Sequence, residues 1–287
     1  MEDGTEPARD EINNHCSQAL KRCLDSFALL DDKEWGKKVS SRWTAKDYLA
    51  HLVIAQEEEA NRLIRQALAG EPAQLPGFDS REEINDYNDR MLASVRDLPV
   101  SELMDRLKAA FEDILGTLAG LSEADLDRPA SSPGWDRAGT VRDHFFASYL
   151  HLPSHYQDIR RAAKKKLPHW MEAGTPEEVH FHLGRTFHYL SLIFRSDRAG
   201  DMQATYLFTM EGEGGGKWSV RIADGKAETD DGAPESFDIE VRTRPELWLD
   251  LSTKDLNPVW AITTGKMHLA GNMSLAMKLD SLFQVNE

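Results

Sequence analysis

Two histidines four residues apart, His151 and His155, are the side chains of this sequence best suited to chemistry. On a helix, residues four apart are surface neighbours separated by about 6 Å, so both imidazoles would lie on one face. Such a pair can bind one divalent metal ion if a third ligand comes from another element. Pro153 stands between them, and a proline inside a helix kinks its axis. The spacing predicts a metal site, and the alternative is a pair of ordinary solvated or hydrogen-bonded helix histidines.

A weak internal repeat points to His51 as the third ligand. Residues 44–47, TAKD, are echoed by residues 140–143, TVRD, and each segment has a threonine followed three residues later by an acid. Both segments can therefore cap the start of a helix. When the two helices are superimposed, the face that carries His51 corresponds to the face that carries His151 and His155. We therefore expect the three histidines to converge if these two helices pack together.

The composition bounds the class of protein. The chain has 287 residues, enough for two domains with separate cores. Its formal net charge of -15 argues against a nucleic-acid partner, because proteins that bind phosphate backbones concentrate Lys and Arg. No apolar run approaches the roughly 20 residues of a membrane span, and the start, MEDGTEPARDE, does not resemble a secretory signal. Two lone cysteines, Cys16 and Cys23, are read as reduced, which indicates a cytoplasmic protein.

Periodicity divides the chain into two halves of different class. Apolar residues recur every three to four positions in the first half, which predicts five helices packed as an antiparallel, four-helix-type bundle. The predicted helices span residues 8–30, 44–68, 80–96, 101–121 and 141–165, with a capping box at residues 80–83. We expect this domain to cover residues 1–166, followed by a linker at residues 167–176 with two prolines and a glycine.

The second half, residues 177–287, predicts an α+β domain with an antiparallel sheet and helices laid over it. Alternating patterns predict strands near residues 202–210, 217–222, 236–241 and 266–269, and helices near 177–194, 244–251, 255–263 and 274–283. Three histidines of the first of these helices, His180, His182 and His188, are never four apart. We therefore interpret them as partly exposed residues without a metal role.

The last forty residues are rich in Trp, Met, Leu and Phe. One interpretation is an ordinary core, and the other is a cavity for an apolar ligand, because Met and aromatic walls adapt to lipid-like shapes. The candidate ligand-binding residues are Trp248, Trp260, Met267, Met273, Met277 and Phe283.

The first half resembles the DinB-like superfamily, which includes thiol-dependent maleylpyruvate isomerases. The resemblance rests on Trp43, Thr44, Asp47 and His51 in the pattern WTxxDxxxH, on Ile84-Asn85 with Arg90, and on the closing HxxxH pair, and it covers about residues 8–165. It implies a divalent metal, zinc with nickel and iron as alternatives, bound by His51, His151 and His155. It also implies a low-molecular-weight thiol such as mycothiol or bacillithiol, which the metal would hold as a thiolate. The isomerase branch is expected to carry Glu where this chain has His151, which puts the isomerase reaction itself in question.

The second half resembles the sterol carrier protein family of non-specific lipid-transfer domains. Residues 265–283, GKMHLAGNMSLAMKLDSLF, are similar to its C-terminal signature, and Leu207-Phe208, Gly212, Trp218, Ile222 and Gly225 match its first strands. This resemblance covers about residues 177–287. It implies an apolar tunnel between sheet and helices.

Three functions remain open. The first is a metal- and thiol-dependent transferase or isomerase of a bacterial cytoplasm, with Glu58 or Glu59 as general base and a second domain that binds an apolar or bulky substrate. The second is a lipid or hydrophobic-ligand binding protein with a structural or regulatory bundle. The third is a degenerate bundle that serves oligomerisation. The expected partner is a small-molecule or lipid-like ligand, and a homodimer is left open.

Overall fold

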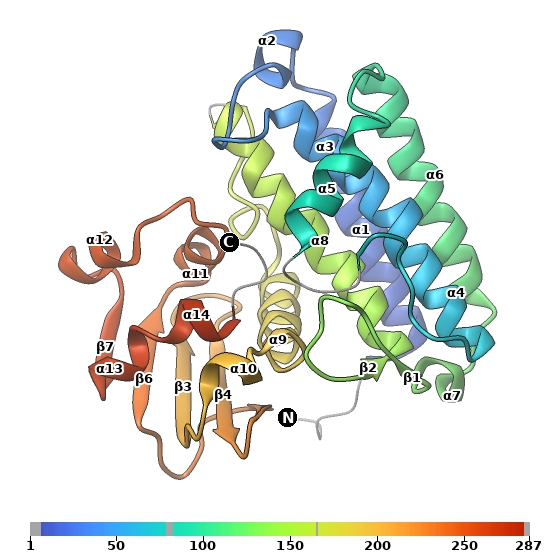
Figure 1. Ribbon diagram of the computed structural model, residues 1–287. Coiled ribbons are helices and arrows are strands. Elements are labelled where there is room, and N and C mark those ends of the chain that lie inside the picture. Colours follow the sequence, from blue (N-terminus) through green and yellow to red (C-terminus); the bar gives the residue numbers. More distant parts are fainter. Residues whose placement is uncertain (1–6, 79–82, 165, 284–287) are drawn as a thin grey trace. The chain divides into compact units, whose positions relative to one another are not determined.

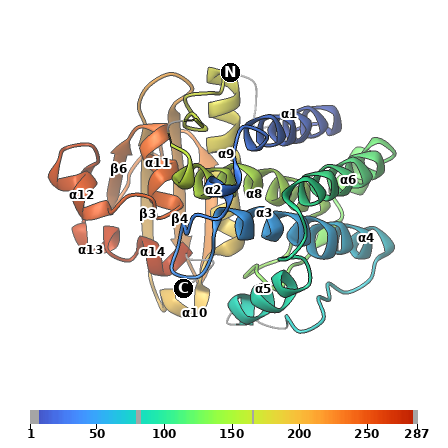
Figure 2. The same ribbon diagram turned by 90° about the horizontal axis from the view of Figure 1, so that it is seen from above.

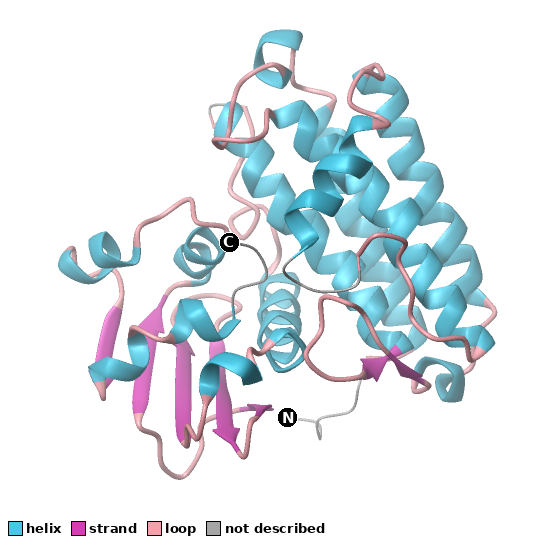
Figure 3. Cartoon of the chain, viewed as in Figure 1, coloured by secondary structure: helices cyan, strands magenta, loops and turns pink. Residues whose placement is uncertain are grey.

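The computed structural model describes residues 7–78, 83–164 and 166–283 (Figure 1). The chain divides into two compact units, one of residues 1–134 with 138–168 and one of residues 135–137 with 169–287. The first unit is helical, and the second combines a sheet with helices (Figure 3). Among the helices of the described residues, none is both long and apolar enough to cross a membrane. The predicted classes of the two parts, a helical bundle followed by an α+β domain, are confirmed.

The first unit is built from long helices with short connections. Its helices are α1 (Arg9–Phe27), α2 (Asp32–Trp35), α3 (Ala45–Ile54), the π-helix η1 (Ala55–Ala60), α4 (Asn61–Ala69), α5 (Ile84–Ala93), α6 (Val100–Ala119), α7 (Glu123–Leu126) and α8 (Val141–Ala162). A two-stranded ladder, β1 (Pro129–Ala130) with β2 (Gly139–Thr140), precedes α8. The capping box predicted at residues 80–83 falls partly outside the described residues.

The two capping signals that defined the internal repeat both form. Thr44 begins α3 and Thr140 begins α8, and each hydroxyl accepts a hydrogen bond from the backbone N–H three residues on. Asp47 and Asp143 reciprocate by accepting from the backbone N–H of the two threonines at 2.8 Å. The equivalent starts fix the rotation of both helices and therefore the faces that carry the histidines.

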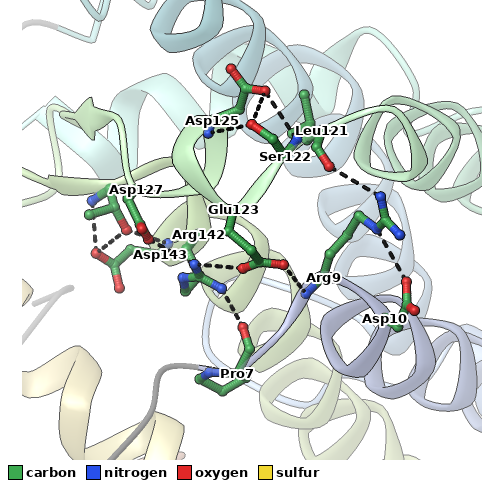
Figure 4. Close-up of polar contacts among 11 residues, drawn as sticks. Pro7, Arg9, Asp10, Leu121, Ser122, Glu123, Asp125, Asp127, Arg142 and Asp143 are labelled. Atoms are coloured by element: carbon green, nitrogen blue, oxygen red, sulfur yellow. Dashed lines mark hydrogen bonds and ion pairs between the residues drawn. The ribbon is translucent and has the colours of Figure 1, made fainter.

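A buried guanidinium also anchors the start of α8 (Figure 4). Arg142 donates to the carbonyl oxygen of Pro7, which precedes α1, and to carboxylates of Glu123 (3.1 Å) and Asp127 (2.7 Å) at α7. One charge therefore joins the beginnings of α1, α7 and α8, and its burial is compensated by two acids.

The helix predicted over residues 44–68 is interrupted, which corrects the sequence-based interpretation. Figures 1 and 2 show α3 and α4 along one line, with the π-helical turn η1 between them. Across this turn Gln56 donates to the side chain of Asn61 at 2.8 Å, and Asn61 donates to the carbonyl oxygen of Ala110 on α6 at 3.0 Å. This buried amide pair stabilises the extra residue that a π-turn inserts.

The second unit contains a five-stranded sheet of order β5-β4-β3-β6-β7. Its strands are β3 (Ala204–Met210), β4 (Gly216–Ala223), β5 (Lys226–Asp231), β6 (Ile239–Thr243) and β7 (His268–Gly271). Its helices are α9 (Pro176–Ile193), α10 (Ser196–Ala199), α11 (Pro245–Ser252), α12 (Pro258–Thr263), α13 (Met273–Ala276) and α14 (Leu279–Phe283). The pair β3 and β6 is parallel, so the sheet is mixed and not wholly antiparallel as predicted.

One face of this sheet carries the aromatic core. Phe208 of β3 lies 4.8 Å from Phe187 of α9 and 5.2 Å from Trp248 of α11, measured between ring centroids. Trp218, the ladder partner of Phe208 on β4, stacks on Phe187 at 5.0 Å. Alternation along a strand sends every second side chain to one face, so α9 and α11 share a single apolar layer with the sheet.

Candidate metal centre

The structure brings the three predicted histidines together inside the first unit. The Nε2 atom of His151 lies 3.1 Å from Nε2 of His51 and 2.9 Å from Nε2 of His155. One ligand atom from each ring lies within 4.8 Å of the other two. Zinc–nitrogen bonds of about 2.0–2.1 Å in a tetrahedron place ligand nitrogens about 3.3 Å apart, so three converging Nε2 atoms fit a divalent ion with a fourth position open.

The tautomer of His155 is fixed by a neighbouring carboxylate. Its Nδ1 atom lies 2.7 Å from Oδ2 of Asp158, and Oδ1 of Asp158 pairs with Arg161 at 2.9 Å. A carboxylate bound at Nδ1 holds the proton there and turns the lone pair of Nε2 toward the other rings. His51 has no equivalent partner, because its buried Nδ1 makes no hydrogen bond.

Burial keeps His51 and His151 in the neutral form that binds metal. Loss of solvation lowers the pKa of His51 and of His151 well below the ordinary value, and the neighbouring histidines lower both further. A neutral imidazole has the free lone pair that a metal ion needs. The chemistry of the donor set therefore suits a borderline metal such as zinc, nickel or iron.

Pro153 does not separate the two histidines of α8. The proline is buried within a continuous helix from Val141 to Ala162, and the hydroxyl of Ser154 donates to the carbonyl oxygen of Leu150 at 2.9 Å. The kink considered from the sequence leaves His151 and His155 facing the same point.

Aromatic side chains surround the imidazoles. Trp43 lies 5.0 Å from His51, and Tyr48 lies 5.4 Å from His155, measured between ring centroids. The indole of Trp43 donates to Asp89 of α5 at 3.3 Å. These contacts limit the rotation of the rings.

The two candidate bases lie in different surroundings on the π-turn. Glu58 is exposed at 44% and accepts from Arg62 at 3.0 Å. Glu59 has a buried carboxyl oxygen, Oε1, without a hydrogen-bond partner, and burial raises the pKa of Glu59 to about 8. Eight residues that include a π-turn rotate about as far as seven α-helical residues, which is two turns. Glu59, and not Glu58, therefore shares the face of His51.

The predicted ligand-binding residues of the second unit are divided between interior and surface. Met267 is buried, Trp248 is largely covered, and Phe283 packs on Phe194 with ring centroids 5.7 Å apart. Trp260, Met273 and Met277 are 42%, 49% and 82% exposed.

The same unit corrects the interpretation of one histidine as partly exposed. His182 is 3% exposed, and burial lowers its pKa to about 3, with a smaller contribution from nearby His169. His169, which the sequence did not single out, lies 3.1 Å from Asp250 through Nε2 and accepts the backbone N–H of Met171 through Nδ1.

Sequence reasoning also missed Asp158, although a signal was available. A carboxylate three residues after His155 lies on the same helix face, where it can orient the ring.

Profiles of two families match the chain in succession. The DinB superfamily matches residues 15–159, and the SCP-2 sterol transfer family matches residues 194–284. The chain therefore belongs to the DinB superfamily, and it carries an SCP-2 sterol transfer domain after the bundle.

Curated relatives match little more than a third of the chain. Hydroxysteroid dehydrogenase-like protein 2 of Homo sapiens is 30% identical over 98 residues, which are 34% of this chain and 23% of that protein. Its counterpart in Mus musculus is 25% identical over 115 residues, 39% of this chain and 24% of that protein. The chain thus spans about a quarter of the length of these relatives.

Among solved structures, the crystal structure of the mycothiol-dependent maleylpyruvate isomerase is similar over most of the chain. The two chains are 13% identical with a TM-score of 0.56, and the similarity covers 85% of this chain and 88% of the other. At this identity the likeness concerns the fold.

Proposed function

We propose that this protein is a divalent-metal-dependent enzyme that uses a low-molecular-weight thiol as a cofactor for a transfer or isomerisation. The observation that carries the proposal is the convergence of three imidazoles from α3 and α8, each with one ring nitrogen within 4.8 Å of the others. His51, His151 and His155 would hold the ion. When bound, a metal such as zinc lowers the pKa of a coordinated thiol or water and supplies a nucleophile near neutral pH.

The residues around the cluster have separate tasks in this proposal. Asp158 keeps the proton of His155 on Nδ1 and so keeps its Nε2 available to the ion. Trp43 and Tyr48 exclude water from one side of the rings. Glu59 is the candidate general base, because a carboxyl with a pKa of about 8 exchanges a proton near neutral pH. The solved isomerase named above is mycothiol-dependent, which supports a thiol in this role.

The second unit is proposed to bind an apolar or bulky substrate. The match to the SCP-2 sterol transfer family and the aromatic layer between sheet and helices support this assignment. The same observations favour a second candidate, a lipid-binding protein whose bundle has a structural or regulatory role. Removal of metal distinguishes the two, because an enzyme would lose its activity whereas a carrier would keep its ligand.

The first experiment is elemental analysis of the purified protein and of His151→Ala after reconstitution with zinc. We expect one divalent ion per wild-type chain and loss of that ion in the variant. The cobalt-substituted protein is then titrated with 2-mercaptoethanol, and a new sulfur-to-cobalt charge-transfer band would support thiol binding at the metal. Absence of metal from the reconstituted wild type would refute the enzyme proposal and leave the lipid-binding function.

A further inference from the structure

Trp248 of α11 has a buried hydrogen-bond donor without an acceptor. Its indole nitrogen Nε1 is inaccessible to solvent and makes no hydrogen bond. A buried donor left without a partner costs about 1–3 kcal/mol, and buried Trp N–H groups usually find one. A buried N–H group without an acceptor is uncommon in a folded domain and therefore needs an explanation.

Other polar aromatic groups of the described residues do find partners. In the second unit, Tyr206 donates its hydroxyl to the carbonyl oxygen of Leu275 at 3.2 Å, and Trp135 donates to the hydroxyl of Tyr189 at 3.3 Å. In the first unit, Trp43 donates to Asp89 at 3.3 Å. The fold thus satisfies comparable donors elsewhere, and Trp248 is the exception among these four.

The rings that contact Trp248 offer no acceptor. Phe187 stacks on its indole with ring centroids 5.3 Å apart, and Phe208 meets it edge to face at 5.2 Å. Trp218 extends the same layer beyond Phe187. An ordered water needs two to four polar partners, which these phenyl rings do not supply. An N–H contact with the face of Phe208 would be only a weak substitute.

We propose that the indole N–H of Trp248 binds the oxygen of an amphipathic ligand whose hydrocarbon part lies against Phe187 and Phe208. The inference rests on the proposed binding of an apolar ligand by the second unit, and it adds the chemical class of that ligand. The oxygen is a neutral hydroxyl or carbonyl, because an ionised carboxylate placed in an aromatic layer without a cation would lose its solvation. Trp248 then selects for one polar atom in a mainly apolar molecule.

Two probes of similar length isolate this hydrogen bond. The full-length protein is loaded with the fluorescent probe 8-anilinonaphthalene-1-sulfonate, which is then displaced by 1-decanol or by undecane, each delivered from cyclodextrin. Trp248→Phe keeps an aromatic ring and removes only the N–H. We expect this variant to weaken 1-decanol three- to tenfold, the range of one net hydrogen bond, and to change undecane less than twofold.

Trp218→Phe is the matched control. Trp218 stacks on the same Phe187, and its indole nitrogen is not among the buried atoms left without a partner. This variant should shift both probes equally. Equal losses for both probes in Trp248→Phe, or no loss for either, would overturn the proposal. Displacement by neither probe in the wild type would instead refute apolar-ligand binding itself, and the inference with it.

A second measurement does not depend on the stability of the variant. In wild-type protein with ¹⁵N-labelled tryptophan, the indole resonance of Trp248 should move downfield when 1-decanol is added and stay in place with undecane. Circular dichroism of Trp248→Phe checks that it folds. An indole resonance that responds identically to both probes would contradict a hydrogen bond to the ligand.

Discussion

The two units both bury histidines, and they arrange them in opposite ways. In the first unit, the Nε2 atoms of His51, His151 and His155 converge. The Nε2 atom of His151 lies 3.1 Å from that of His51 and 2.9 Å from that of His155. In the second unit, His169 uses both nitrogens in hydrogen bonds, one with Met171 and one with Asp250. In the first arrangement, nitrogen lone pairs of the three rings face one another and can bind a metal ion. In the second, both ring nitrogens of His169 are already engaged in hydrogen bonds.

This difference shows that burial of histidine is not by itself a sign of a metal site. Burial lowers the pKa in both units, to about 3 for His182 and to well below the ordinary value for His51. What differs is the direction of the lone pairs, which the second nitrogen of each ring and its partner decide.

The strongest test of the comparison removes one histidine from each unit. His51→Ala should weaken zinc binding by more than about 100-fold, because two imidazoles alone seldom retain the ion. His169→Ala should leave one zinc per chain, since its nitrogens are already engaged. Competition with a chromophoric chelator measures both variants. Loss of zinc in both would mean that the histidines of the second unit also contribute to the site.

A rise in pH should lower the free energy of unfolding of the first unit, because of Glu59. The pKa of this carboxyl is raised by burial from 4.5 to about 8, so the folded unit holds a proton that the unfolded chain has released. Its stabilising effect is complete below pH 4.5 and disappears as the pH rises to about 8. At 1.36 kcal/mol per pKa unit, the shift from 4.5 to about 8 corresponds to a change on the order of 5 kcal/mol. Hydrogen exchange in the α3–α4 segment, measured between pH 5 and 8.5, reports it.

Glu59→Gln should remove most of this dependence, whereas Glu58→Gln, on the exposed side of the same turn, should keep it. An unchanged pH slope in Glu59→Gln would show that its carboxyl is not responsible.

A fall in pH should lower the free energy of unfolding of the second unit, because of His182. The folded-state pKa of about 3 lies below the ordinary 6.5, so the unfolded chain binds a proton that the folded unit excludes. The stabilising contribution of His182 is therefore complete above pH 6.5 and is lost as the pH falls toward 3, a change on the order of 5 kcal/mol. Hydrogen exchange of α9 is the measurement. His182→Gln should flatten the slope, and His180→Gln, at an exposed position of the same helix, should not.

Much of the fold could be predicted because local signals were strong. The capping pairs of Thr44 with Asp47 and Thr140 with Asp143 define helix starts by side-chain chemistry alone, and they also allowed His51 to be matched with His151 and His155. The π-turn could not be predicted, because it depends on the contact of Asn61 with the carbonyl oxygen of Ala110, which lies 49 residues away.

The second unit was harder to predict at its edges and interior. Strand β5, KAETDD, is an edge strand whose side chains are mostly exposed, so it has no apolar alternation to detect. The parallel pairing of β3 with β6 depends on a crossover that no local pattern specifies. His182 was interpreted as partly exposed because helical spacing alone does not say which helix face the sheet will cover.

The smallest effect, and the finest test of the comparison, concerns the carboxylates that bind histidines in both units. Asp158→Asn would remove the charge that holds the proton on Nδ1 of His155. Loss of such a partner usually weakens metal binding 10–100-fold. We expect a value in this range from chelator competition, with the ion still bound at saturating zinc.

Asp250→Asn is the control in the second unit, because Asp250 contacts His169 in the same manner at 3.1 Å without a converging lone pair. It should leave the zinc affinity unchanged. Equal zinc affinity in Asp158→Asn and wild type would show that the rings of the first unit are oriented by packing against Trp43 and Tyr48 alone. The direction of the lone pairs would then follow from the aromatic wall and not from the carboxylate.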